Sequence, residues 1–293
     1  MEGLEEYKKA GKIAAEVREW SKSLIKPGAK ALDIAEAIES RIKSKGAEIA
    51  FPCNVSLNDV AAHYTPPAKD TLVISEKDLV TIDLGAHTDG YISDTAYTID
   101  LSGENGKLVE ASDAALEAAI ATVKAGVSVA KIGEAVEAAI RSHGLKPIEN
   151  LTGHELLQWE LHGPMAIPNI KVPFDKNLEE GQVFAIEPFA TNGRGRVIEG
   201  NRVEIYSYLE TVPVRLPEGR RITEFAEKRQ GLPFAERWFA DMNPLKLKMA
   251  IRELTARGAL HGYPVLHEAE KGLVSQSEHT VIVESEGCCV TTA

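Results

Sequence analysis

Two aspartates that are eleven positions apart could hold a metal ion. Residues 79–99 read LVTIDLGAHTDGYISDTAYTI, an alternating pattern interrupted by Asp89-Gly90, which is a strong turn signal for a β-hairpin. Asp83 would lie on the first strand and Asp94 on the second, as cross-strand neighbours. Two carboxylates buried side by side are costly unless protons or cations compensate their charge. A divalent cation would compensate best, and solvent-facing carboxylates are the alternative.

Three further segments supply side chains that could join this pair. His154 follows a glycine turn, Glu187 ends the apolar run VFAI, and Glu278 stands just before the run TVIV. Each residue alone is more often structural than functional. Together with the aspartates they form a set of four carboxylates and one imidazole. The expected metal ligands are Asp83, Asp94, His154, Glu187 and Glu278.

The chemistry of this ligand set indicates the kind of site. Its donors are mostly hard oxygens and include no cysteine, which disfavours a structural zinc site. Four carboxylates would nearly balance two divalent ions with a bridging water between them, the usual arrangement for metal-assisted hydrolysis. Mn(II), Fe(II) and Co(II) all suit the donors. A single structural cation is the alternative.

An internal duplication would bring the ligands together. Residues 25–46 and 123–144 share nine identities at a constant offset of 98, and both show helical apolar spacing that ends at a glycine. Two amphipathic helices that are alike only in composition are the alternative. His63 and His162 stand 99 positions apart. We therefore expect two α+β halves with approximate two-fold symmetry, each contributing acids and a histidine to a central cleft.

The second half carries additional sequence between its last two acids. Residues 197–265 are helical in pattern and poor in expected strands, with helices predicted at 234–240 and 244–257. Asn243 is placed to cap the second helix, and Pro244 suits its first turn. The segment is therefore predicted to be a helical insertion.

The composition limits which partners and which cellular compartment are expected. The chain has 293 residues, of which 33 are basic and 44 acidic, giving a net charge of −11. Such a surface would repel a phosphate backbone, so nucleic acid is not expected as a partner. Three cysteines, two of them adjacent, do not form a disulfide framework and favour a reducing cytoplasm. The sequence has no apolar stretch long enough to span a membrane.

Several motifs resemble those of a known family. The chain is similar, along essentially its whole length, to the methionine aminopeptidases of type II in their archaeal form. The segments that carry the resemblance are AFPCNVSLNDVAAHYTP (50–66), IDLGAHTDGYISDTAYT (82–98), NLTGHELLQWELHGPMAIPN (150–169), FAIEPFAT (184–191) and QSEHTVIVE (276–284).

The resemblance implies an α+β architecture known as the pita-bread fold, with two pseudo-symmetric halves around a central antiparallel sheet. It implies one catalytic domain over residues 1–293, with residues 197–265 as the inserted helical subdomain of type II. The implied activity is removal of the N-terminal methionine from nascent proteins. In that reaction, water activated by two metal ions attacks the first peptide bond.

The resemblance also assigns roles to the metal ligands. Asp83 would chelate one ion, and His154 would hold the second together with Glu187. Asp94 and Glu278 would bridge the two ions, which the family resemblance leaves as Co, Mn, Fe(II) or Zn. Glu187 is the candidate for transferring the proton of the water, with a purely structural ligand role as the alternative.

The resemblance further implies which residues contact the substrate. His63 would lie near the scissile amide, and His162 would stabilise the carbonyl oxygen. The methionine pocket would be formed by Phe51, Leu161, Phe189 and Tyr263. Two departures from the family pattern are Ser277, where an aromatic residue is usual, and Gly163-Pro164 after His162.

Two other functions remain open on the sequence. Related pita-bread hydrolases of the Xaa-Pro aminopeptidase or prolidase kind use the same ligands but commonly carry an additional N-terminal domain, whereas the first helix here is expected within a few residues of Met1. A non-catalytic pita-bread binding protein would have lost ligands and gained a basic face. The expected partners are N-terminal methionine peptides and nascent polypeptides, with the ribosome as a further candidate, and a monomer is expected.

Overall fold

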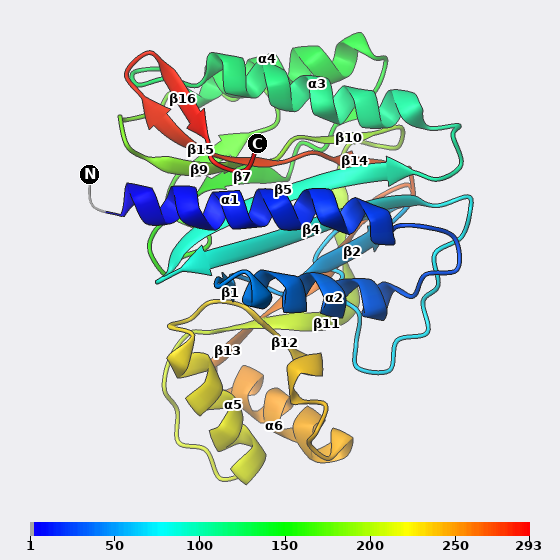
Figure 1. The fold of residues 1–293 in the computed structure, drawn as a ribbon, viewed down its shortest axis with the longest axis vertical. Helices are drawn as coiled ribbons and strands as arrows, with labels where there is room; N and C mark the ends of the chain where they lie inside the picture. The colour runs from blue at the N-terminus through cyan, green and yellow to red at the C-terminus, as the bar shows by residue number, and fades with distance from the viewer. Residues whose placement is uncertain (1–2) are drawn as a thin grey trace.

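The fold places two helix-covered sheets side by side. The computed structural model describes residues 3–293 (Figure 1). The first half contains helices α1 (Leu4–Ser21) and α2 (Ala31–Ser44) and strands β1 (Glu48–Ile49), β2 (Asn54–Leu57), β4 (Leu79–Thr88) and β5 (Tyr91–Asp100). The four strands form one antiparallel sheet in which β4 pairs with the other three. Apolar side chains of both helices pack on this sheet and form the core of the first half.

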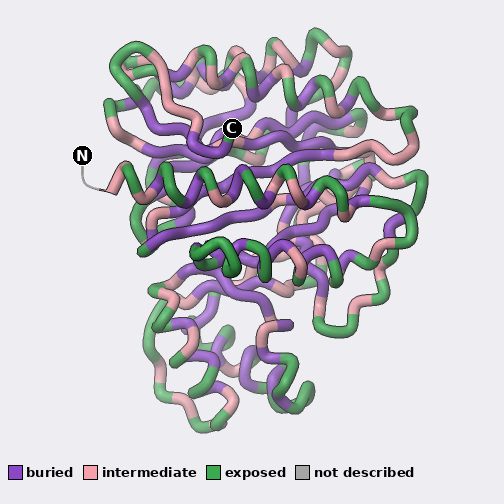
Figure 2. The backbone as a smooth tube through the Cα atoms, in the orientation of Figure 1, coloured by how far each residue is buried: buried purple, intermediate pink, exposed green. Residues whose placement is uncertain are grey.

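The second half repeats this plan. It contains helices α3 (Gly106–Thr122) and α4 (Val129–Ser142) and strands β7 (Thr152–Glu155), β8 (Ala166–Pro168), β9 (Val183–Ile186), β15 (His279–Glu284) and β16 (Gly287–Val290). These strands form an antiparallel sheet in the order β16-β15-β9-β7-β8. A smaller sheet joins β10 (Phe189–Thr191) to β6 (Lys146–Pro147) and β14 (Val274–Gln276). The strands of both halves are largely buried, while the outer faces of the helices are exposed (Figure 2).

The helix pairs agree with the predicted duplication. Helices α2 and α4 begin and end 98 positions apart, at residues 31 and 129 and at residues 44 and 142. The turns before them also match, because Gly28 and Gly126 adopt positive φ angles of 86° and 81°. Such angles favour glycine, which explains why this residue type occurs in both copies.

The predicted hairpin is present, with a register that the sequence did not predict. Strands β4 and β5 are joined at Asp89 and Gly90, whose φ angles of 49° and 82° suit a tight hairpin turn. Asp83 pairs with Ala96, and Asp94 pairs with Gly85. The two aspartates are therefore diagonal neighbours on one face of the sheet rather than direct partners.

Hydrogen bonds connect the two halves beside these aspartates. The backbone N–H of Glu278 donates to the carbonyl oxygen of Ala96 at 3.0 Å, and the Thr95 hydroxyl donates to the Glu278 carbonyl oxygen at 2.8 Å. The Asp94 N–H donates to the Thr280 hydroxyl at 2.7 Å. The boundary between the halves thus runs through residues expected to bind metal.

The expectation that residues 197–265 are poor in strands is wrong. The segment starts in strand β11 (Val197–Tyr208) and ends in β13 (Leu260–Glu268), and these pair with each other, with β12 (Phe234–Ala235) and with β3 (Val60–Ala62). Register shifts between Glu199, Val203 and Ile205 interrupt the two-residue alternation, which is why the sequence pattern concealed the long strand.

Between these strands, the segment is helical and has a core of its own. It contains α5 (Pro217–Lys228), the 3₁₀ turn η2 (Glu236–Phe239) and α6 (Pro244–Ala256). Helix α6 and its cap are as predicted, since the Asn243 side chain accepts hydrogen bonds from the backbone of Leu245 and Lys246. The helix predicted at 234–240 is instead β12 followed by η2. Within residues 3–293, no helix is both long and apolar enough to cross a bilayer.

Candidate active site

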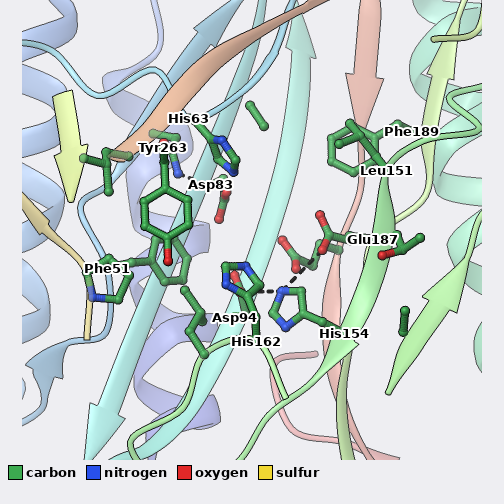
Figure 3. A pocket seen from close by; sticks show the side chains of 18 of the residues that line it. Phe51, His63, Asp83, Asp94, Leu151, His154, His162, Glu187, Phe189 and Tyr263 are labelled. Carbon is green, nitrogen blue, oxygen red and sulfur yellow. Dashed lines mark hydrogen bonds and ion pairs between the residues drawn. The ribbon is translucent and has the colours of Figure 1, made fainter. Parts of the chain in front are cut away.

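All five predicted metal ligands line one cavity of about 350 Å³ between the halves (Figure 3). The Nε2 atom of His154 lies 3.3 Å from Glu187 Oε1 and 3.8 Å from Asp94 Oδ2. Possible ligand atoms of Asp94, His154 and Glu278 all lie within 4.8 Å of one another. The first half supplies Asp83 from β4 and Asp94 from β5, and the second half supplies His154 from β7, Glu187 after β9 and Glu278 between β14 and β15.

Burial and the repulsion of neighbouring carboxylates perturb the pKa values of the four carboxyl groups. Burial, opposed by a hydrogen bond from Asn54, raises the pKa of Asp83 to about 7. Burial, followed by the charges of Asp83 and Glu187, raises the pKa of Asp94 well above its ordinary value. The pKa values of Glu187 and Glu278 are raised in the same way. Without a cation the cluster therefore holds protons that isolated carboxyl groups would lose.

These groups fit divalent metal. Buried Oδ1 atoms of both Asp83 and Asp94 have no hydrogen-bond partner among residues 3–293. An unpaired buried carboxylate oxygen is costly, and a cation would satisfy it. Burial and the nearby His162 lower the pKa of His154 well below its ordinary value, so this imidazole is neutral, as a metal ligand must be.

The two substrate-contacting histidines predicted from the family also face this cavity. The rings of His162 and His154 are 4.5 Å apart between centroids, and His63 lies 5.5 Å from the ring of Tyr263. Burial and the nearby His63 lower the pKa of His162 to about 4, and burial lowers the pKa of His63 as well. Both imidazoles are therefore neutral near pH 7 and are able to donate or accept one hydrogen bond at each nitrogen.

Backbone geometry fixes the position of His63. Its φ angle of 65° is in the left-handed region, which is uncommon for residues other than glycine. Its Nδ1 atom lies 3.1 Å from the carbonyl oxygen of Pro264 on β13. Backbone strain of this kind often occurs at functional positions.

The predicted pocket residues Phe51, Leu161, Phe189 and Tyr263 all line the cavity. Sequence reasoning missed Asn54, which is directly opposite Asp83 on β2 and donates its side-chain N–H to Asp83 Oδ2 at 3.1 Å. A polar residue within the apolar segment AFPCNVS was the available signal. It also missed Ile205 and Pro233, by which the inserted segment contributes to the wall.

Comparison with known proteins assigns the chain to a family. Residues 5–224, about three quarters of the chain, match metallopeptidase family M24. The chain belongs to this family. A methionine aminopeptidase of Pyrococcus horikoshii is 49% identical over 286 residues, which cover 97% of each chain. Another, of Methanocaldococcus jannaschii, is 44% identical over 293 residues, covering 100% of this chain and 99% of the relative.

Solved structures share the M24 fold at lower sequence identity. A thermophilic Arx1 has a TM-score of 0.86 at 22% identity, covering 98% of this chain and 90% of that one. A methionine aminopeptidase of Thermotoga maritima has a TM-score of 0.72, also at 22% identity, covering 98% and 95%. The predicted pita-bread fold and the predicted resemblance to methionine aminopeptidases are confirmed, and the chain is a metallopeptidase in kind.

At the two departures from the family pattern, Ser277 and Gly163 have local explanations in this M24 chain. The Ser277 hydroxyl bonds to Asp113 and lies 2.9 Å from the Ser112 hydroxyl, so it is directed toward α3 and is not part of the cavity lining. The N–H of Gly163 donates to the Glu155 carbonyl oxygen at 2.8 Å, and a Cβ at this glycine would lie 3.0 Å from the Glu155 backbone oxygen. Gly163 thus allows the loop that carries His162 to approach β7 closely.

Proposed function

We propose that this M24 peptidase is a methionine aminopeptidase whose activity depends on two divalent cations held between its halves. One observation carries the proposal, namely that four carboxyl groups, two of them fully buried and two largely buried, and a neutral imidazole converge on one cavity. The charge of two dications would balance that of the four carboxylates. The relatives, aligned over almost their full lengths, support the choice of methionine as the residue removed.

In this proposal each half supplies part of the ligand set. Asp83 would help hold one ion, and His154 together with Glu187 would help hold the other. Asp94 and Glu278 would complete the ligand set from the boundary between the halves. Bound divalent cations would polarise the substrate carbonyl and lower the pKa of a water molecule, which supplies the nucleophile for hydrolysis.

The remaining polar groups act on the substrate. His162 donates a hydrogen bond to the carbonyl oxygen, where negative charge develops as the peptide bond is attacked. His63 contacts the scissile amide, with its orientation fixed by the Pro264 carbonyl. Glu187 accepts a proton and returns it to the leaving amine. The two histidines lie close to Tyr263, so the chain can hold one peptide bond between them.

The cavity is suited to a flexible apolar side chain. Its predicted walls are Phe51, Leu161, Phe189 and Tyr263, and its volume of about 350 Å³ is at the small end of ligand pockets. An unbranched thioether adapts to such walls and contacts aromatic rings favourably. We therefore propose that the methionine side chain occupies this space.

Several features support a setting for this activity. The net charge of −11 disfavours nucleic acid as a partner, and the cysteine pattern favours a reducing compartment. We propose that the enzyme acts as a cytoplasmic monomer on nascent polypeptides, near the ribosome. Sedimentation of the protein alone and with translating ribosomes would test the oligomeric state and the proposed proximity separately.

The first prediction concerns metal-dependent methionine release. Metal-free protein should release no methionine from the peptide Met-Ala-Ser, and Mn(II) or Co(II) should restore release with two ions bound per chain by calorimetric titration. Asp94→Asn removes one proposed bridging charge, so it should lose activity by about a hundredfold or more while remaining folded by circular dichroism. One tightly bound ion without peptide cleavage would instead indicate a structural cation.

A further inference from the structure

Arg229 is a largely buried cation just beyond the end of α5 in the inserted segment. Burial lowers its pKa to about 10. It takes part in none of the ion pairs found among residues 3–293, and its guanidinium carbon lies 5.0 Å from the centre of the Trp238 ring. The charges of Glu48 and Glu39 favour the guanidinium, but neither carboxylate forms an ion pair with it, so other contacts must compensate much of the cost of burial.

Three backbone carbonyl groups compensate one end of the guanidinium, while its buried Nε atom has no hydrogen-bond partner among residues 3–293. The Nη2 atom of Arg229 donates to Ile49 O at 2.8 Å, to Ala50 O at 3.0 Å and to Pro233 O at 2.9 Å. The first two carbonyls belong to the segment after α2, whereas the third belongs to the inserted segment. A single guanidinium nitrogen therefore ties together two parts of the chain that are distant in sequence.

Both tied segments lead directly into the cavity wall. Phe51 follows Ala50 and lines the cavity, as does Pro233. The ring of Phe51 lies against the backbone of Gly85, where even a Cβ atom would collide with it. Gly85 is paired with the proposed ligand Asp94. The place of Phe51 is thus fixed from one side by β4 and from the other through Arg229.

A purely local role does not account for these contacts. A cation at a helix C-terminus stabilises the helix dipole, and a solvent-exposed side chain would serve that purpose. The apolar core around α5 is formed by other residues, among them Ile222, Phe225 and Ala226. The Arg229 guanidinium instead reaches carbonyls outside its own helix.

We propose that Arg229 is a positioning residue that sets the width of the pocket for the first side chain of the substrate, by holding the Phe51 and Pro233 walls at a fixed separation. The inference rests on the proposed aminopeptidase function. It assigns to the inserted segment a part in selecting an unbranched side chain. Arg229 lies outside the cavity lining and would act only through the backbone that it binds.

The test compares Arg229→Met with wild type on the peptides Met-Ala-Ser and Leu-Ala-Ser in the presence of Mn(II). Without the guanidinium the two walls separate, so the KM for Met-Ala-Ser should rise about tenfold while kcat stays within about threefold. The preference for methionine over leucine should fall by a similar factor. Mn(II) affinity, measured by calorimetry, should be unchanged because no proposed ligand is bound by Arg229.

Two further variants make the result specific. Arg221→Met is the matched control, since Arg221 lies on α5, two turns before Arg229, but forms an exposed ion pair with Asp241 at 2.7 Å. It should leave KM and selectivity unchanged. Arg229→Lys keeps a charge and three N–H donors, so it should restore most of the lost affinity and selectivity. If Arg229→Met does not fold, Arg229→Gln replaces it with the same expected rise in KM.

The outcomes separate this inference from the proposed function. Wild-type protein that releases methionine, together with a folded Arg229 variant of unchanged KM and unchanged Met/Leu preference, would overturn the inference alone. A loss of thermal stability without any change in KM would also overturn it, because a merely structural arginine predicts that result. Wild-type protein that releases no methionine would overturn the proposed function and the inference with it.

Discussion

His63, Asp83 and Asp94 occupy positions that are unfavourable in the metal-free protein. His63 has a left-handed backbone, and each aspartate has a buried oxygen without a hydrogen-bond partner among residues 3–293. Hydrogen bonds elsewhere hold these residues in place, through Pro264 for His63 and Asn54 for Asp83. The chain therefore prepares the site before any ligand binds, at a cost in stability that bound ligand would repay.

The raised carboxyl pKa values predict how the stability of the metal-free protein depends on pH. Asp83 titrates near 3.8 when unfolded and near 7 when folded, so between these values the native state binds more protons than the unfolded state. The contribution of Asp83 to the free energy of unfolding should therefore fall as pH rises through this range, while the buried histidines, whose pKa values are lowered, contribute in the opposite direction. Thermal unfolding of chelated protein should show this carboxyl contribution as a fall of several degrees in melting temperature between pH 5 and pH 7.5, measured relative to Asp94→Asn, which has the same histidines.

Two controls apply to this pH prediction. Saturating Mn(II) should remove the fall, since cations replace the protons that the cluster holds. Chelated Asp94→Asn should show a smaller fall than chelated wild type, because one of the repelling charges is absent. A chelated Asp94→Asn protein with the same pH dependence as chelated wild type would contradict the raised carboxyl pKa values.

At the same scale, residue types and spacing predicted the four carboxylates and the imidazole that meet in the cavity, whereas its walls, Phe51, Leu161, Phe189 and Tyr263, were implied by the family resemblance. Their relative positions were less predictable. Asp83 and Asp94 are diagonal because the strand register follows from the two-residue turn, and the sequence pattern alone did not fix that pairing. Asn54 was missed because a single polar residue in an apolar strand carries little information without its partner across the sheet.

Among the elements, α2 and α4 carry a glutamate at equivalent positions, and the two glutamates make different contacts. Glu137 on α4 is near the surface and pairs with Arg141 at 2.8 Å. Its counterpart Glu39 on α2 is buried, forms an ion pair with Arg237 and accepts a hydrogen bond from Trp238 at 2.9 Å. Arg237 and Trp238 belong to η2, so Glu39 joins α2 to the inserted segment.

This buried pair predicts a large and specific loss of stability. Arg237→Met leaves Glu39 buried without its cation, which should lower the free energy of unfolding by about 3–5 kcal/mol. The double variant Glu39→Gln/Arg237→Met should recover a large part of that loss, because it buries no unpaired charge. Urea denaturation followed by circular dichroism measures all three proteins.

The equivalent exposed pair serves as the control for that series. Glu137→Gln/Arg141→Met should change the free energy of unfolding by less than about 1 kcal/mol, as is typical of surface ion pairs. An Arg237→Met protein as stable as wild type would show that the contact between α2 and η2 contributes little.

The elements differed in how well the sequence predicted them. Helices of the repeat were predictable because their apolar spacing occurs twice, and α6 because it has a capping asparagine followed by proline. Strand β11 was missed because its bulges disturb the alternation, and the helix predicted at 234–240 is wrong because this segment, rich in aromatic residues that favour strands, forms β12 and η2. Phe234 and Phe239 in fact pack on Phe225 of α5, with ring centroids 6.0 and 5.1 Å apart.

Across the whole molecule, the duplication predicts equivalent responses at equivalent positions. Gly28 and Gly126 both have positive φ angles, and a Cβ at either residue would meet no atom within 4 Å. Gly28→Ala and Gly126→Ala should therefore each lower the free energy of unfolding by about 1–2 kcal/mol, the cost of a left-handed alanine. Urea denaturation should give similar values, and Mn(II) affinity should be unchanged.

The control for the glycine pair lies on a helix of ordinary geometry. Gly106 begins α3 without a positive φ angle, and a Cβ there would also meet no atom within 4 Å. Gly106→Ala should be neutral or slightly stabilising, since alanine loses less chain entropy on folding. A difference of more than about 1 kcal/mol between the Gly28 and Gly126 variants would show that the halves are alike in shape but not in energetics.

Strand β15, which docks beside β5 at the boundary between the halves, has a consequence for how the protein is made. A ribosome would release Asp83 and Asp94 early, His154 and Glu187 later, and Glu278 only after a further 91 residues of synthesis. Domains start to fold while synthesis continues, so the first half could form its hairpin long before the last carboxylate exists. Until β15 emerges and docks beside β5, a growing chain would have an unfinished coordination sphere. Translation itself would thus time the onset of catalysis, and a truncated product ending before Glu278 would be inert.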